Sequence, residues 1–172
     1  MSRSTPLRLD SLLTGLFYLG LGLTGAPAFM VLRPLLFVEG DPAGTLTNLA
    51  IREGLARLAV ALELGAVIFQ VLTGVWFARL FRATDAHAAN TIAHFASVIA
   101  VATLASAVMI AAALDAATGV NAAANPGLSY LLLQTSGHFF AFGAIFFGLW
   151  LLPMGWLIMK ADFGPRALGW IL

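Results

Sequence analysis

The chain has no cysteine among its 172 residues, which excludes a disulfide, a thiolate nucleophile and a thiolate-bound metal. Charge is also scarce, because charged residues make up 10% of the sequence against about 25% in soluble domains. The net charge of +1 comes without a cluster of basic residues, so no nucleic-acid partner is predicted. The sequence contains no zinc-protease histidine motif, glycine-rich phosphate loop, nucleophile elbow or paired catalytic carboxylates. No catalytic residue and no metal ligand are therefore predicted, and a non-enzymatic role is favoured over an enzymatic one.

Hydrophobic residues, by contrast, make up 60% of the sequence, where about 45 to 50% is usual for soluble domains. They gather in runs long enough to cross a bilayer, which takes about 20 residues of helix. One soluble core cannot bury this much apolar surface, so lipid must surround much of it. We therefore predict an all-α integral membrane bundle, in which residues 1–172 form a single transmembrane domain in the lipid bilayer. The predicted spans are residues 11–32, 54–81, 91–114 and 128–159, and residues 163–172 start a fifth helix.

The first apolar run also has features of a secretory signal peptide. It follows the basic residues Arg3 and Arg8, and Ala26-Pro27-Ala28 resembles a small-residue cleavage site. The apolar run continues well past that site and is too long for the core of a signal peptide. A transmembrane helix is therefore the favoured interpretation, with a kink expected at Pro27.

Polar and helix-breaking residues separate the spans. Proline, glycine and aspartate between Glu39 and Gly44 predict a loop, after which Thr47 or Asn48 is expected to cap the next helix. Small residues recur at helical spacing in the third and fourth spans, and such faces favour close helix contact. They are Ala96, Ala100, Thr103 and Ala107 in the third span, and Gly137, Ala141, Ala144 and Gly148 in the fourth.

Basic residues near the ends of the spans predict the orientation. An N-terminus in the cytoplasm places most of them on the cytoplasmic side, as is typical of membrane proteins. The inner group is Arg3, Arg8, Arg79, Arg82, Lys160 and Arg166, and the outer group is Arg33, Arg52 and Arg57. Residue usage is typical of a bacterial gene, so we expect a location in the bacterial cytoplasmic (inner) membrane.

Glu63 is the most informative polar residue within the spans. It lies about 13 Å from the outer end of the second span by helix rise, at a depth where a charge is costly. Gln70 is seven residues further along and shares its face. His138 is expected at a similar depth in the fourth span and would pair with Glu63 if those two spans touch. Such a pair indicates a proton relay or a substrate site, and a structural polar contact between helices is the alternative.

Arg57 and two histidines have competing interpretations. Arg57 lies near the outer surface, where Glu53 is four residues earlier and offers an ion pair. The alternative for Arg57 is an anion-binding role at the mouth of a cavity that contains Glu63. His94 and His138 are candidate axial ligands for a haem, but their different depths argue against it. No cofactor is therefore predicted, with haem kept as the alternative.

Three stretches of the chain, taken together in their order, indicate a family resemblance. They are residues 52–58 (REGLARL) with Glu63 behind them, residues 148–156 (GLWLLPMGW) and residues 163–170 (FGPRALGW). This order resembles the bacterial multi-pass membrane family called domain of unknown function 4386, and the resemblance covers nearly the whole chain. Members of that family look like six-span proteins of unassigned activity, so the resemblance implies a fold but no reaction. The chain departs from the pattern by ending where a fifth span would begin, which predicts a C-terminal truncation.

Three functional hypotheses follow from these residues. The first is a non-enzymatic integral membrane protein of unknown role, with an intramembrane polar site formed by Glu63, His138, Gln70 and Arg57. The second is a small transporter or proton-linked carrier that uses Glu63 and His138. The third is a haem- or quinone-linked membrane redox subunit that uses His94 or His138. A helix–helix partner or a second copy of the chain is a further expectation for the membrane-embedded surface.

Overall fold

The structure of the protein is a computed structural model that describes residues 4–119 and 123–161, and every regular element in these residues is helical. The elements are α1 (Ser4–Ala26), the π-helix η1 (Pro27–Leu32), α2 (Arg33–Leu36), α3 (Pro42–Ile51), α4 (Glu53–Phe81), α5 (Ala86–Thr118) and α6 (Pro126–Lys160). Four helical segments are long and apolar enough to cross a membrane: Leu9–Leu36, Glu53–Phe81, Ala86–Thr118 and Pro126–Lys160. The prediction of an all-α bundle with four membrane-spanning helices is confirmed. The predicted start of a fifth helix at residues 163–172 lies outside the described residues.

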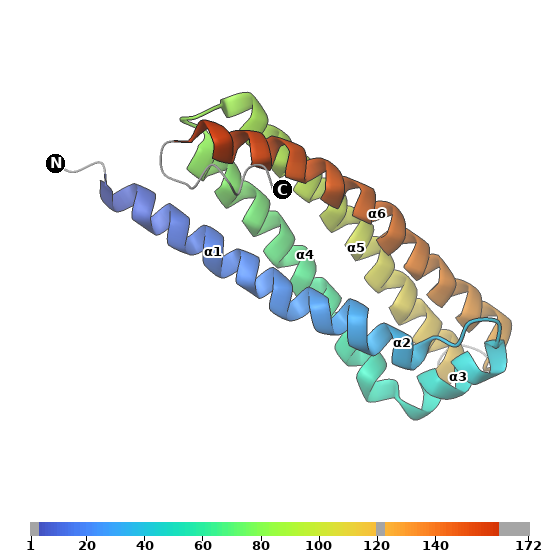
Figure 1. The fold of residues 1–172 in the computed structure, drawn as a ribbon. Helices are drawn as coiled ribbons and strands as arrows, with labels where there is room; N and C mark the ends of the chain where they lie inside the picture. The colour runs from blue at the N-terminus through green and yellow to red at the C-terminus, as the bar shows by residue number, and fades with distance from the viewer. Residues whose placement is uncertain (1–3, 120–122, 162–172) are drawn as a thin grey trace.

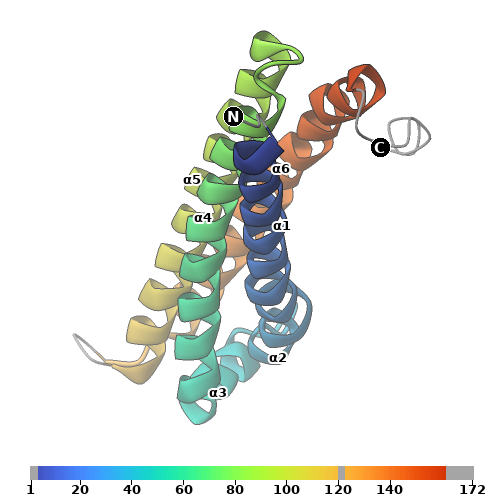
Figure 2. The same cartoon turned by 90° about the vertical axis from the view of Figure 1, so that its left-hand side faces the viewer.

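The four long segments lie side by side along the length of the molecule (Figure 1). α4 packs against α1 on one side and against α5 on the other, and α6 packs against α5. α1, η1 and α2 follow one another along nearly the same axis, and α3 crosses the end of the bundle where α2 stops (Figures 1 and 2). α1 and α6 are therefore on opposite flanks, with α4 and α5 forming the layer that joins them.

The first span changes its helical pitch at Pro27, where the sequence predicted a kink. Proline has no backbone N–H to donate to the preceding turn, which weakens the α-helical pattern there. The chain continues as a π-helix, in which the N–H of Arg33 donates to the carbonyl of Ala28, five residues earlier. This wider turn shifts the face that the following residues present, so Arg33 faces the bundle rather than continuing the face set by α1.

Polar side chains cap the helices that follow. Asp41 caps α3 by accepting a hydrogen bond from the N–H of Gly44, so the predicted cap at Thr47 or Asn48 is wrong by about two turns. Asp85 caps α5 in the same way, and Asn125 caps α6. Because these caps lie before the predicted starts, the third and fourth spans are longer than the hydrophobic pattern alone indicated.

Small residues bring α4 and α5 together. All four small residues predicted to form a contact face in the third span are buried on α5. On α4, Gly74 lies so close to Ala96 that an added methyl group would collide with it. The corresponding prediction for the fourth span is wrong, because Ala141, Ala144 and Gly148 are exposed. The buried face of α6 is a different one, and it includes Ser136, Gly143 and Trp150.

The outer surface of the bundle is rich in exposed apolar side chains. Leu12, Leu23, Met30, Val101 and Leu152 are each more than 60% exposed. A surface of this kind is unfavourable in water and favourable in lipid, so it supports the assignment of a multi-pass membrane protein.

Candidate intramembrane site and cleft

Glu63 of α4 is completely buried, and its carboxylate is held from two directions. Oε1 accepts hydrogen bonds from Nε of Arg33 at 3.0 Å and from Nη2 of Arg33 at 2.8 Å. Oε2 accepts a hydrogen bond from the hydroxyl of Ser106 at 2.7 Å. Glu63 is ten residues into α4, about 15 Å by helix rise, so this is a charged pair well inside the span.

Ser106 extends the site from α4 to α6. Its hydroxyl oxygen accepts a hydrogen bond from Nη2 of Arg33 and lies 3.1 Å from the hydroxyl oxygen of Ser136. Since Ser106 has one proton and donates it to Glu63, Ser136 is the donor in the second contact. The Arg33–Glu63–Ser106–Ser136 network therefore connects the start of α2 with α4, α5 and α6. Both serines are completely buried, so the network joins the helices at a site closed to bulk solvent.

Aromatic rings cover the other faces of the Arg33 guanidinium. Its central carbon lies 5.2 Å from the centre of the Phe29 ring and 5.6 Å from that of Phe140. The two rings are themselves stacked, with their centres 4.1 Å apart. Cation–π contacts of this kind stabilise a guanidinium where water is scarce, and the Arg33 side chain is only 14% exposed.

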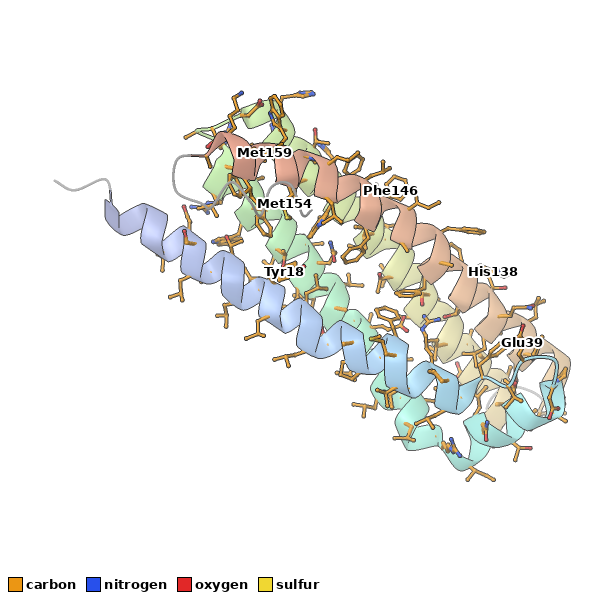
Figure 3. The ribbon with its side chains drawn as sticks, viewed as in Figure 1. Tyr18, Glu39, His138, Phe146, Met154 and Met159 are labelled. Atoms are coloured by element: carbon orange, nitrogen blue, oxygen red, sulfur yellow. The ribbon has the colours of Figure 1, made fainter. Side chains whose placement is uncertain are left out.

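The partner of Glu63 is thus Arg33 and not His138. His138 is exposed on α6, where its ring stacks on Phe142 with 6.0 Å between the centres. Figure 3 shows His138 toward the end of the bundle at which α2 and α3 lie. His138 lies on an exposed face of α6, whereas the α6 residue that reaches the network is the buried Ser136.

A cavity of about 430 Å³ lies at the end of the bundle near α2. We call it the outer cavity, because the pattern of basic residues predicts that this end faces outward. Arg33 and His138 both line this cavity, together with Glu39 and Gln134. His138 therefore shares a cavity with Arg33 although it does not contact Glu63. Arg33 contacts both the buried carboxylate of Glu63 and this polar cavity.

A second cavity of about 390 Å³ is a half-open cleft between α1 and α6, with α4 and α5 as its floor. Tyr18, labelled in Figure 3, contributes from the α1 side. Glycine and alanine on both walls leave space that larger side chains would fill. The described lining residues include no charged group: Tyr18, Leu21, Gly22, Gly25, Ala26, Phe29, Ala66, Gln70, Ile99, Ala102, Thr103, Phe139, Phe140, Gly143, Ala144 and Phe147.

Gln70 is the polar residue that stands out in this cleft. It is 2% exposed, and among the described residues neither its amide oxygen nor its amide nitrogen has a hydrogen-bond partner. A buried amide without partners is costly, by about 1 to 3 kcal/mol. Gln70 and Glu63 are both buried on α4, at the seven-residue spacing from which the sequence predicted a shared face. Gln70 lines the cleft, whereas Glu63 belongs to the ion-pair network.

The remaining candidate residues lie elsewhere. Arg57 pairs with Glu53 across one helical turn at 2.6 Å, which confirms the simpler of its two interpretations. His94 is exposed near the start of α5, whereas His138 lies in the outer half of α6, so no shared site forms between them. Within residues 4–119 and 123–161, no three histidine or acidic side chains gather into a metal-binding cluster.

These features define a multi-pass helical membrane protein with a buried ion-pair network and a separate apolar cleft. A family model described as a domain of unknown function (DUF4386) matches residues 13–172. The chain therefore belongs to this family, and the family assignment made from the sequence is confirmed. Neither the comparison with curated proteins nor the comparison with solved structures returned a match.

Proposed function

We propose that the protein is a non-enzymatic protein of the bacterial inner membrane that binds an apolar small molecule in the cleft between α1 and α6, with its N-terminus in the cytoplasm. The unpartnered amide of Gln70 is the observation that supports this proposal. A bound ligand that satisfies the amide would recover the free energy that its burial costs. The cleft volume of about 390 Å³ is within the range of small-molecule sites.

The lining of the cleft indicates the chemistry of the ligand. Its walls are largely aliphatic and aromatic, and none of the described lining residues is charged, so the ligand is uncharged and mostly hydrocarbon. The amide of Gln70 offers both a donor and an acceptor. One hydroxyl group can accept from Nε2 and donate to Oε1. The ligand class is therefore a slender apolar alcohol that enters from the bilayer.

Retinol is a suitable probe because it is a slender apolar alcohol whose fluorescence is excited by energy transfer from tryptophan. Titration into protein in lipid nanodiscs should give saturable energy transfer in the wild type. Gln70→Leu should weaken binding about tenfold, which is the loss of about 1.4 kcal/mol when one hydrogen bond is removed. Gln134→Leu makes the same chemical change in the outer cavity, outside the cleft, and should leave the affinity unchanged.

Competition distinguishes hydrogen bonding from simple partitioning into lipid. Farnesol should displace retinol better than the hydrocarbon farnesene in the wild type, and equally well in Gln70→Leu. The same affinity for retinol in the wild type and in Gln70→Leu would contradict the proposal. So would protection of the cleft by a second copy of the chain, seen as a dimer that excludes the probe.

A proton-linked carrier is a second candidate, favoured by the outer cavity that His138 shares with Arg33. In this alternative, protons would enter the outer cavity at His138 and pass to the Glu63 carboxylate, while the Arg33 guanidinium stays protonated throughout. A pH gradient imposed across proteoliposomes should then collapse faster with the wild type than with His138→Gln. His87→Gln alters a histidine outside the cavity and serves as the control. Equal rates in all three preparations would exclude the carrier.

A further inference from the structure

The cleft and the outer cavity share two of their lining residues, Phe29 and Phe140. These two side chains come from η1 and α6, which lie on opposite flanks of the bundle. Their rings are stacked with 4.1 Å between the centres and an angle of 22° between the planes. The same aromatic pair thus closes the outer end of the cleft and forms part of the wall of the outer cavity.

Arg33 holds this aromatic pair in place. Its guanidinium lies against both rings, and its Nε and Nη2 atoms are fixed on the buried carboxylate of Glu63. α1 and α6 make few direct contacts, so the Phe29–Phe140 stack is one of a small number of links between the first span and α6, together with the Phe37–Tyr130 stack. Separation of two stacked rings costs little beyond the loss of their burial. A change of side-chain conformation at Phe29 or Phe140 can therefore open the partition while the Arg33–Glu63 ion pair stays intact.

We propose that Phe29 and Phe140 form a gate, and that the cleft and the outer cavity are two parts of one route for the ligand. This inference rests on the proposed function for the identity of the ligand. An apolar alcohol held at Gln70 has lipid on the open side of the cleft and the gate at its outer end. Beyond the gate, Glu39 and His138 offer polar groups to the hydroxyl end. The protein thereby transfers its ligand between the bilayer interior and the outer face.

The absence of native cysteine makes the route directly testable. Ala144→Cys places a single thiol on the wall of the cleft. A negatively charged, membrane-impermeant thiosulfonate added to intact cells reaches this thiol only through an aqueous path. Labelling should be slow in the Ala144→Cys protein and at least about tenfold faster when Phe140→Ala is added. Phe142→Ala removes an exposed ring two residues away on the same helix and should leave the rate unchanged.

A second gate variant guards against a folding defect in the first. Phe29→Ala opens the partition from the η1 side and should accelerate labelling as Phe140→Ala does. Rapid labelling without any gate mutation, or equal rates for the Phe140→Ala and Phe142→Ala proteins, would overturn the gate. Retinol titration of the same proteins separates the two proposals. If the wild type shows no saturable binding of retinol, the ligand site is refuted. If retinol binds but the gate variants are labelled no faster than the Ala144→Cys protein alone, only the route is refuted.

Discussion

Arg33 and Glu63 are separated by 30 residues in the chain and form an ion pair with 2.8 Å between Nη2 and Oε1, in a span where lipid replaces water. The cost of moving both charges out of water is high, and only good geometry with further hydrogen bonds offsets it. Both conditions are met, because Ser106 satisfies the second carboxylate oxygen and two rings cover the guanidinium. The pair therefore stabilises the packing of η1 and α2 on α4.

We expect Glu63→Gln to lower the free energy of unfolding by about 3 to 5 kcal/mol, because it leaves the Arg33 charge buried without a counter-charge. Unfolding in mixed detergent micelles, followed by circular dichroism, measures this change. The double variant Arg33→Met with Glu63→Leu removes both charges and should restore most of the lost stability.

Glu53→Gln is the matched control for this prediction, because it breaks the other arginine–glutamate pair of α4 at an exposed site. Its effect should stay below about 1 kcal/mol, the usual range for surface pairs. If Glu63→Gln and Glu53→Gln destabilise the protein equally, the buried network has no special structural role.

The sequence was sufficient to predict the helical class, the four spans and the Arg57–Glu53 pair, because each depends on local spacing or local hydrophobicity. Arg33 escaped prediction because the π-helix before it changes the face on which it lies. Arg33-Pro34 alone is typical of a loop at the end of a span. A signal was nevertheless present, since Pro27 within an apolar run indicates a break in the regular helix.

The cleft was beyond prediction for a different reason. Gln70 was identified as a polar residue within a span, but its missing partners depend on which helices lie opposite. α1 and α6 are far apart in the chain, and no periodicity in either helix reports that they leave a gap between them. The periodicity of a sequence predicts which face of a helix is buried. It does not predict which other helix packs against that face.

We expect Gln70→Leu to raise the melting temperature of the ligand-free protein. The substitution replaces an unpartnered buried amide by a side chain of similar size that needs no hydrogen bond, so the gain is about 1 to 3 kcal/mol. Differential scanning fluorimetry in detergent without added ligand checks the direction. Gln134→Leu, at a less buried position on α6, should change the melting temperature by much less. A lower melting temperature for Gln70→Leu would mean that the amide has a partner after all.

Gly74→Ala should separate α4 from α5. A methyl group at Gly74 would collide with the Cβ atom of Ala96, which is not the end of a flexible side chain and cannot move aside on its own. Overpacking at such a contact costs about 1 to 3 kcal/mol. Gly54→Ala provides the control in the same helix, because no other atom lies near its added methyl group and alanine is the better helix former. The melting temperature should fall for Gly74→Ala and rise for Gly54→Ala. A higher melting temperature for Gly74→Ala would contradict the close contact.

Asp85 should make stability depend on pH at the α4–α5 turn. The backbone N–H of Ala88 and the Lys160 ammonium, in that order, lower the pKa of the Asp85 carboxyl below its ordinary value of 3.8. A carboxyl with a lowered pKa in the folded state contributes stability above its ordinary pKa, and loses that contribution as the pH falls through the folded-state pKa. Asp85→Asn keeps a capping oxygen but cannot ionise. Its melting temperature should therefore not show the decrease in acid that the Asp85 carboxyl causes in the wild type.

The difference in melting temperature between the wild type and Asp85→Asn should therefore be constant near neutral pH. It should shrink once the pH drops below about 4. Lys160→Gln removes the contact between Nζ and Oδ2 at 3.2 Å but leaves the hydrogen bonds from His87 and Ala88. It should reduce the decrease in acid without abolishing it, because the backbone donor is the larger cause of the lowered pKa. Melting curves recorded across this pH range test both variants. A difference between wild type and Asp85→Asn that persists unchanged into acid would show that Asp85 contributes through its shape and not through its charge.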